Sequence, residues 1–289
     1  ILIDCGLFQG LKTLRVRNWS PLPINVSEID AVVLTHAHVD HSGYIPRLIK
    51  DGFRGRIYAT AATHDLCKIL LPDTGYLMEE EAAYLNKRNR TKHKPALPLF
   101  SQAEAELSLQ YFEPMPFNDR ISLPGGISFE FTYAGHIFGA AQVIMKCDGK
   151  QIAFTGDIGR MQDPLLYPPA KLTGADFLVM ESTYGNRLHE NDSVADTLER
   201  IICDTHARGG VIVIPAFAVG RAQALMYYLA ELKKAGRIPD FPMYLNSPMA
   251  ENASGLLTKY RELHRLDVAD CDATCNVVRY VRSPDESRW

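Results

Sequence analysis

The sequence predicts a layered α/β protein with a second α/β part after the first. Three observations predict this fold class. Short apolar runs typical of strands alternate with glycine-rich or proline-rich turns and with stretches whose apolar residues recur at helical spacing. After Glu181 the pattern changes to longer alternating helices and strands, which is typical of a βαβ unit. Histidines and carboxylates stand where several predicted strands end.

Composition excludes several protein classes. The 289 residues correspond to about two domains, enough to bury a core without disulfides. Hydrophobic residues make up 46% and charged residues 22%, which argues against a disordered or membrane-embedded chain. The longest mostly apolar run, 211–220, is about half of what a bilayer-spanning helix needs, so no membrane partner is expected. Six scattered cysteines favour a reducing compartment, the cytoplasm or, in a eukaryote, the nucleus.

The first part opens on an apolar strand at Ile1 that breaks at Asp4 and Gly6. The chain begins without an initiator methionine and stops in a polar stretch after Ser283, so we expect a fragment of a longer protein. The further predicted strands are Ala31–Leu34, Arg56–Ala59, Ile127–Tyr133, Gln142–Cys147, Gln151–Phe154 and Phe177–Met180. The predicted helices are Gly43–Lys50, Ala61–Leu71, Glu79–Asn89 and Gln102–Gln110.

The second part has the element lengths of a βαβ unit. We place the boundary between the domains so that residues 1–186 form the first and residues 187–289 the second. The paired glycines at 209 and 210 end the first predicted helix of this part. The predicted elements are helix Val194–His206, strand Val211–Ile214, helix Val219–Ala235, strand Met243–Asn246 and the strand-like run Asn276–Val281.

The strongest chemical signal is the run THAHVDHS at residues 35–42, directly after a predicted strand. Residues two apart in extended backbone point the same way, so His36 and His38 can present both imidazoles to one ion. Asp40 and His41 lie beyond the turn and can serve a second ion. The alternative is a run of surface polar residues, but three crowded histidines would repel one another on protonation without an ion. The spacing therefore predicts a metal centre.

Two further residues stand at strand ends. His136 lies in AGHIFGAA and Asp157 lies in FTGDIGR, and each is either a metal ligand or a turn residue on pattern alone. Sites in layered α/β proteins gather at one edge of the sheet, which favours the ligand interpretation. The remaining histidines lack such a setting and are interpreted as surface or helix residues. They are His64, His93, His189, His206 and His264.

In combination these motifs resemble those of the metallo-β-lactamase fold. The matching residues are Asp4 at the end of an early strand, the HxHxDH run at 36–41, His136 in AGHIFGAA and Asp157 in FTGDIGR. Glu181 in MESTYGNR, PAFAVGRAQAL from Pro215 and NSPMA from Asn246 narrow the resemblance to the β-CASP branch. Within that branch the sequence is similar to RNA-processing nucleases related to the pre-mRNA cleavage and polyadenylation endonuclease and its prokaryotic relatives. The resemblance implies an αββα sandwich, incomplete at both ends, with an inserted β-CASP α/β domain.

The resemblance also implies two zinc ions per complete chain. The implied ligands are His36, His38 and His136 for one ion, Asp40 and His41 for the other, and Asp157 as the bridge between them. The implied catalytic residues are Asp40, Asp157 and Glu181. The resemblance implies that Asp4 orients the histidine loop without binding a metal ion itself.

The implied function is zinc-dependent hydrolysis of phosphodiester bonds in RNA, as an endonuclease or a 5′ exonuclease, by a hydroxide that two metal ions activate. Single-stranded RNA is the expected partner, and a homodimer or a processing complex stays open. With a net charge of -3, the chain must meet a polyanion through a local patch or through metal. The candidates for RNA contact are Lys87, Arg88, Arg90 and Arg221. For the basic run at 87–94, a solvated helix end is an interpretation of equal weight to RNA contact.

The sequence departs from the branch pattern in two places. No later histidine motif occurs before Trp289, and Asn246 stands where the DSPMA element has aspartate. Two alternatives therefore stay open, a nuclease of the DNA-acting arm of the branch and an inactive RNA-binding paralogue. The complete set of ligand residues argues against the inactive paralogue. A thioester or lactam hydrolase is disfavoured because those enzymes lack the second domain.

Overall fold

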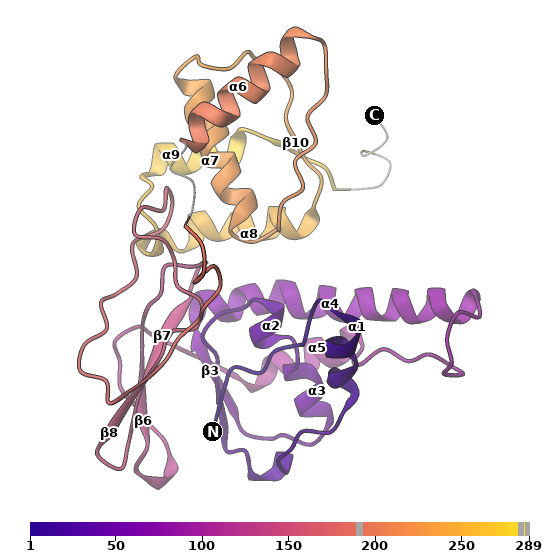
Figure 1. The fold of residues 1–289 in the computed structure, drawn as a ribbon, viewed down its shortest axis with the longest axis vertical. Coiled ribbons are helices and arrows are strands. Elements are labelled where there is room, and N and C mark those ends of the chain that lie inside the picture. Colours follow the sequence, from indigo (N-terminus) through magenta and orange to yellow (C-terminus); the bar gives the residue numbers. More distant parts are fainter. Residues whose placement is uncertain (189–192, 283–285, 287–289) are drawn as a thin grey trace. The chain divides into compact units, whose positions relative to one another are not determined.

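A computed structural model describes residues 1–188, 193–282 and 286 of the chain. The chain folds into two compact units, of which unit 1 comprises Ile1–Gly159 and Pro169–Glu181. Unit 2 comprises Arg160–Pro168 and Ser182–Trp289 (Figure 1). The domain boundary that we place between residues 186 and 187 stays a prediction. The mixed α/β class is confirmed.

Unit 1 contains a four-stranded parallel sheet, here called sheet A. Its strands, in spatial order, are β1 (Leu2–Ile3), β2 (Ala31–Val33), β3 (Arg56–Thr60) and β4 (Phe112–Met115). All three residues of β2 are buried, as expected for a parallel strand that is covered on both faces. The carboxyl ends of β1 and β2 therefore lie side by side at one edge of this sheet.

A second sheet of unit 1, sheet B, is mostly antiparallel. Its strands, in spatial order, are β5 (Ile121–Ser122), β6 (Ser128–Tyr133), β7 (Ala141–Cys147), β8 (Lys150–Phe154) and β9 (Phe177–Val179). Strands β5 to β8 pair antiparallel, whereas β8 and β9 pair parallel. As a result β6, β8 and β9 run in the same direction, and their carboxyl ends share one edge.

The two sheets bury a common apolar core. Val33 of sheet A packs in one cluster with Phe129, Phe131, Val143 and Met145 of sheet B, all of them buried. A backbone bond from Ala141 N to Thr35 O, 2.9 Å long, also joins the sheets. Because apolar burial drives folding, this core fixes the two sheet edges relative to each other within unit 1.

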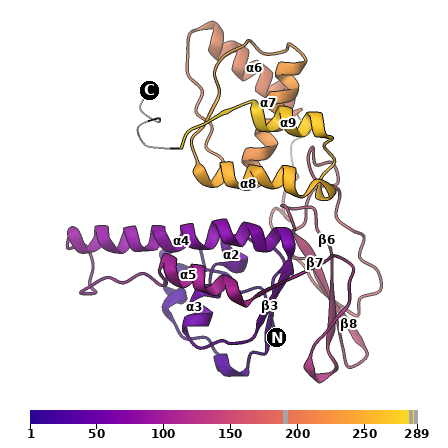
Figure 2. The same cartoon turned by 180° about the vertical axis from the view of Figure 1, so that it is seen from behind.

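Helices cover sheet A on the side away from sheet B (Figures 1 and 2). They are α2 (Val39–Ser42), α3 (Ile45–Lys50), α4 (Ala61–Lys87) and α5 (Gln102–Ser108), and α1 (Lys12–Arg15) lies in the connection between β1 and β2. The helices, sheet A and sheet B form the first three layers of the predicted sandwich. None of the described helices has the length and apolar character needed to cross a bilayer.

Helix α4 corrects the sequence analysis, which predicts two helices over 61–71 and 79–89. The structure has one helix of 27 residues that continues past Pro72. Leu70, Leu71 and Gly75 are buried around the proline, and a Cβ on Gly75 would lie 2.7 Å from Ser101 O. Burial against the start of α5 thus stabilises the helix where proline alone would break it.

Strands β4 and β5 are additions to the predicted set. Pro114 lies inside β4, and a proline within a run normally argues against a strand. Strand β4 is at the edge of sheet A, where the missing N–H need not meet a neighbour. Strand β5 has two residues, too few for a periodic signal.

Unit 2 is mainly helical. Its helices are α6 (Val194–Ala207), α7 (Arg221–Lys234), α8 (Pro248–Lys259) and α9 (Val268–Asn276). Strands β10 (Tyr244–Leu245) and β11 (Arg279–Tyr280) pair in parallel. Ile202, Leu232, Ile238 and Met243 are the buried residues of its apolar cluster.

The prediction of a strand at 211–214 is wrong. These residues form no strand, and Val211 and Val213 are 88% and 85% exposed. An apolar run becomes a strand only when a neighbouring strand pairs its backbone. In the described part of unit 2, β10 pairs with β11, and no strand pairs with residues 211–214.

Candidate metal centre

The histidine loop begins where β2 ends. After Val33 the chain passes through Thr35 and His36 to His38, which is the residue before the first turn of α2. His36 is completely buried and His38 is half-buried. Strand geometry and the immediate start of a helix therefore hold both imidazoles at the edge of sheet A.

His136 and Asp157 come from sheet B. His136 follows β6 and Asp157 follows β8, at the shared edge of that sheet. Gly159 N donates to Ala134 O over 2.9 Å and so binds the two loops together. A Cβ on Gly159 would lie 1.8 Å from Gly135 O, so only glycine permits this approach.

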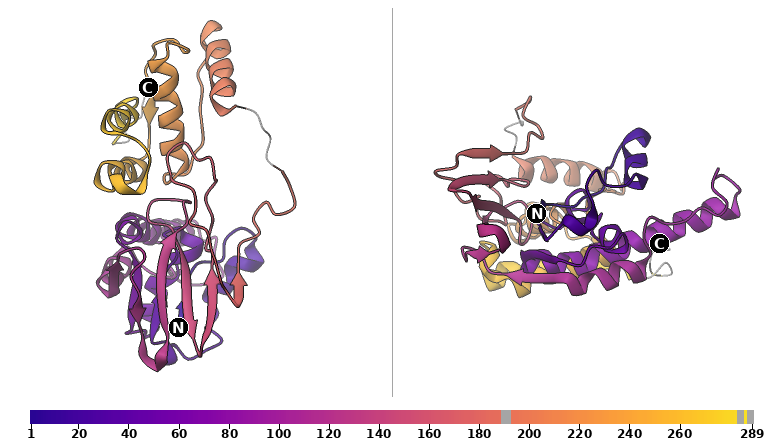
Figure 3. Two further views of the ribbon diagram at one scale, coloured as in Figure 1. Left: turned by 90° about the vertical axis from the view of Figure 1, so that its left-hand side faces the viewer. Right: turned by 90° about the horizontal axis from the view of Figure 1, so that it is seen from below.

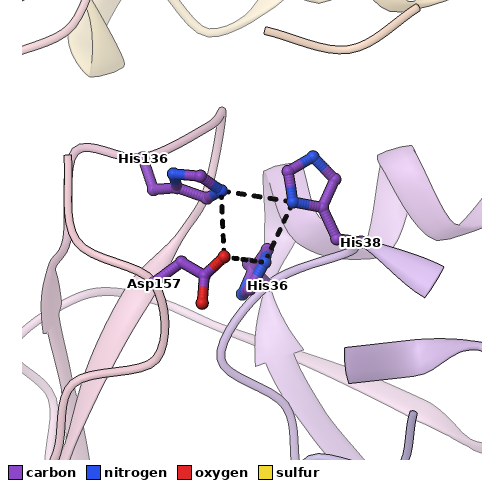
Figure 4. Close-up of side chains that lie close together, drawn as sticks. All are labelled: His36, His38, His136 and Asp157. Carbon is purple, nitrogen blue, oxygen red and sulfur yellow. Dashed lines mark hydrogen bonds and ion pairs between the residues drawn. The ribbon is translucent and has the colours of Figure 1, made fainter. Parts of the chain in front are cut away.

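The side chains of His36, His38, His136 and Asp157 converge (Figure 4). Their potential ligand atoms all lie within 4.8 Å of one another. His38 Nδ1 is 3.1 Å from His36 Nε2 and 3.2 Å from His136 Nε2. Asp157 Oδ2 is 3.4 Å from His136 Nε2 and 3.8 Å from His36 Nε2. Three nitrogens and one oxygen can therefore reach a single cation.

The second oxygen of Asp157 faces another histidine. Asp157 Oδ1 is 3.3 Å from His41 Nε2, and His41 Nδ1 is 2.7 Å from Asp4 Oδ2. The two oxygens of Asp157 thus face different imidazoles. Asp40 is exposed in the first turn of α2 and lies outside the four-residue group.

The electrostatics keep three of the imidazoles neutral. Burial, followed by the neighbouring histidines, holds the pKa of His36 well below its ordinary value. Burial and His136 lower the pKa of His38 to about 4. Burial likewise lowers the pKa of His136, although Asp157 and Glu181 oppose it. Neutral imidazole is the form that binds metal, so the three nitrogens are ready to act as ligands at neutral pH.

His41 differs from the other three histidines, because its hydrogen bond with Asp157 favours the charged form of both side chains. Burial disfavours the charged form of His41, but hydrogen bonds to Asp157 and Asp4 outweigh it and raise the pKa to about 10. Burial also works to raise the pKa of Asp157, but the hydrogen bond and charge of His41 lower it below its ordinary value. His41 is therefore a cation between two carboxylates and must lose a proton before it can bind a metal.

Thr35 is a supporting residue that the sequence analysis missed. Asp4 accepts hydrogen bonds from Thr35 N at 2.7 Å and from Thr35 Oγ1 at 2.8 Å. The same hydroxyl lies 3.1 Å from His36 Nδ1, so His36 presents Nε2 to the cluster. Asp4 has a left-handed backbone with φ 62°, a conformation in which aspartate is enriched. In the sequence, the feature that could have indicated Thr35 is its position directly before His36.

Glu181 holds the loop that carries Asp157. Glu181 Oε1 accepts from Ile158 N at 2.7 Å, and Glu181 N donates to Thr155 Oγ1 at 3.2 Å. It follows β9 and thereby joins the same edge of sheet B as the ligand residues. The structure thus places Glu181 against the loop that carries Asp157, and its catalytic role stays a prediction.

The basic run lies at the other end of α4. The first turn of α4 is near the His136 loop, because Thr60 Oγ1 donates to Gly139 O over 2.7 Å. Lys87 ends the helix, and 27 residues span about 40 Å. Lys87 is therefore about that far along the helix from its first turn, and Arg88 and Arg90 follow within three residues of the helix end. Arg221 is exposed at the first position of α7 in unit 2.

We expect Asp4→Asn to weaken metal affinity and any activity of the centre by about ten- to hundredfold, the usual cost of losing a residue that orients a ligand. Asparagine can still accept from Thr35, but it removes the charge beside His41. Zinc affinity is measured by competition with a chelating dye. Asp119→Asn, at an exposed position, is the control and should leave affinity unchanged. Equal affinity of both variants would contradict the role of Asp4.

Fold and site together define a mixed α/β protein with a histidine and carboxylate metal centre at the edge of two packed sheets. The chain belongs to the beta-lactamase superfamily, because the model of the beta-lactamase superfamily domain matches residues 1–202. The model of the Beta-Casp domain matches residues 222–288. The resemblance to the metallo-β-lactamase fold and its β-CASP branch is thus confirmed.

Curated relatives from bacteria, archaea and eukaryotes match most of the chain. Ribonuclease TTHA0252 from Thermus thermophilus is 37% identical over 86% of this chain and 53% of its own length. Transcription termination factor FttA from Methanosarcina mazei is 34% identical, over 87% of this chain and 38% of its own. Cleavage and polyadenylation specificity factor 73 from Drosophila melanogaster is 30% identical, over 90% of this chain and 36% of its own length. The chain thus spans about half or less of the length of these relatives.

Proposed function

We propose that the protein is a zinc-dependent hydrolase that cleaves phosphodiester bonds in RNA and holds two zinc ions per complete chain. One observation carries the proposal: three neutral imidazoles and a carboxylate converge, and the second carboxylate oxygen turns to His41. With two ions bound, Asp157 would be shared between them. Hydrolases in which two ions act on one phosphate use such a shared site, which supports the proposal.

The donor atoms fit zinc. Imidazole nitrogens with a carboxylate oxygen are typical zinc ligands, and the neutral state of the three histidines meets the requirement for deprotonated donors. We assign His36, His38 and His136 to one ion, with Asp157 shared. We assign His41 and Asp40 to the other. When bound, such ions act as Lewis acids on phosphate oxygens and lower the pKa of water.

The residues of the chain orient this centre. Asp4 binds Nδ1 of His41, so Nε2 of the same ring faces Asp157. Glu181 fixes the Asp157 loop through Ile158 N with one carboxylate oxygen. We assign Glu181 a part in protonating the leaving oxygen, the general acid step that a phosphodiester needs, as the carboxylate partner of a histidine in the complete protein.

The names of the relatives favour RNA as the substrate. One is called a ribonuclease and another a cleavage and polyadenylation factor. The complete ligand set disfavours an inactive RNA-binding paralogue, and DNA cleavage is the second candidate in the test. Arg221, Lys87, Arg88 and Arg90 remain proposed RNA contacts, of which the last three act at a distance from the centre. We further propose cytoplasmic or nuclear action, alone, as a homodimer or within a processing complex.

The test uses the full-length protein, purified without chelator. We expect metal analysis to find about two zinc ions per chain, as in other two-metal hydrolases. End-labelled single-stranded RNA should be cleaved, a DNA oligonucleotide of the same sequence much more slowly. A chelator should abolish cleavage and added zinc should restore it. A protein free of zinc, or one that cuts only the DNA, would overturn the proposal.

A further inference from the structure

The segment Phe8–Trp19 begins four residues after Asp4, close to the metal centre in the chain. Cys5 N donates to His41 O over 2.7 Å, and Leu7 N donates to Val39 O over 3.0 Å. The next residue, Phe8, is four residues beyond Asp4, so the backbones of these two residues are at most about 14 Å apart. In Figure 3 the indigo stretch that contains α1 projects from the rest of unit 1.

This segment exposes large apolar side chains. Leu11 is 73% exposed, Val16 55%, Trp19 53% and Phe8 47%. Exposed large apolar side chains mark an interaction site when they gather on one surface. All the residues of the segment except Asn18 are exposed. The segment therefore contributes little to the core of unit 1.

Cations alternate with these apolar residues. Lys12, Arg15 and Arg17 are all exposed, and no acidic residue occurs between Cys5 and Ser27. This is a local positive charge on a chain whose net charge is -3. A polyanion is the partner that such an uncompensated charge attracts.

The segment is also ordered by its own contacts. Phe8 N donates to Asn18 Oδ1, and Asn18 Nδ2 donates to Phe8 O, both over 2.9 Å. The guanidinium carbon of Arg17 lies 5.2 Å from the centre of the Phe8 ring. One aromatic ring is thus held with a cation against it before any partner binds. Preorganisation of this kind lowers the entropic cost of binding.

We propose that the Phe8–Trp19 segment is a docking surface for single-stranded RNA. Phe8 and Trp19 stack on bases, and Lys12, Arg15 and Arg17 neutralise phosphates, a combination that binds strands of any sequence. The inference rests on the proposed function and deepens it, since it names the surface that holds nucleotides next to the bond that is cut. A protein partner on the same surface is the competing outcome.

Trp19 provides a direct reporter. These 289 residues contain two tryptophans, so Trp289→Phe in the full-length protein, with any further tryptophan also changed to Phe, leaves Trp19 as the single emitter. Titration with an oligouridylate in the presence of zinc should quench the emission of Trp19 in a saturable way. Added salt should reverse the quenching. Emission that does not respond to saturating RNA would overturn the proposal.

Matched variants test the two kinds of contact. The double variant Lys12→Glu with Arg15→Glu should weaken binding of a fluorescent RNA. The slope of the logarithm of the binding constant against the logarithm of salt concentration should fall in magnitude by more than about one. Arg120→Glu with Lys146→Glu makes the same change in charge at other exposed positions of unit 1 and should have a smaller effect. Trp19→Ala should weaken binding roughly five- to hundredfold, from the usual strength of one base stack. Tyr76→Ala, at a similarly exposed aromatic, is its control.

The outcomes separate this inference from the proposed function. In the full-length protein with zinc bound, binding that depends on Lys12, Arg15 and Trp19 without any cleavage would support the surface and contradict the nuclease. Cleavage and binding that are equal in the test and control variants would overturn the surface and leave the nuclease intact. If the segment variants change only the sedimentation of the protein, it is a protein interface and the proposal fails. Circular dichroism confirms that each variant is folded.

Discussion

Asp157→Ala is expected to abolish RNA cleavage while leaving the fold largely intact. Oδ2 of Asp157 faces His36 and His136, and Oδ1 faces His41, so one substitution removes a ligand from both proposed ion positions. Changing a residue that only orients a ligand already costs about ten- to hundredfold, so we expect a loss beyond that range. The side chain belongs to a loop at the sheet edge and not to the core between the sheets. Stability should therefore change little.

Activity is measured on labelled RNA with full-length protein at saturating zinc, and zinc content is measured in parallel. The matched control is Asp119→Ala, which removes an exposed carboxylate of the same unit and should retain full activity and zinc. Thermal unfolding checks that both variants fold. Full residual cleavage by Asp157→Ala would remove its assigned bridging role.

Gly6→Ala is expected to disrupt the centre through packing. A Cβ on Gly6 would lie 1.5 Å from Asp40 O, 2.0 Å from Asp40 C and 2.6 Å from His41 N. These are backbone atoms, so no side chain can move aside, and relief requires a shift of the chain between Asp4 and α2. Overpacking of this kind costs about 1–3 kcal/mol or more. The same shift pulls His41 away from Asp4 and should lower zinc content.

Unfolding in urea and metal analysis together test this prediction. Gly255→Ala is the control, because a Cβ on Gly255 in α8 would meet nothing within 4 Å. Alanine in a helix interior is better than glycine by about 0.5–1 kcal/mol, so this variant should be slightly stabilised. If Gly6→Ala were as stable as the parent protein with full zinc content, the close approach of Gly6 to Asp40 would be wrong.

Each of the four residues that converge has a local signature in the sequence. His36 and His38 follow a strand at a spacing of two, and His136 and Asp157 follow strands that apolar runs and glycines mark. Local periodicity reports strand ends well, because the pattern and the structure have the same period. It was the resemblance, and not periodicity, that indicated Asp4 and Glu181.

Other features depend on contacts that no local pattern encodes. Helix α4 continues through Pro72 because Gly75 packs against the start of α5, and β4 tolerates Pro114 because it lies at an edge. The apolar run at 211–214 fails to form a strand because no strand pairs with it in the described part of unit 2. In each case a distant neighbour overrides the propensity of the segment.

By itself, the sequence determined which atoms could bind metal and at which strand ends they stand. Only the tertiary structure decided that they meet, that Asp157 turns one oxygen to His136 and the other to His41, and that the basic run at 87–94 is far along α4. His38 and His136 are 98 positions apart, yet their ring nitrogens lie 3.2 Å from each other. The physical reason is that the shared core of two sheets, built from residues distant in the chain, brings their edges together.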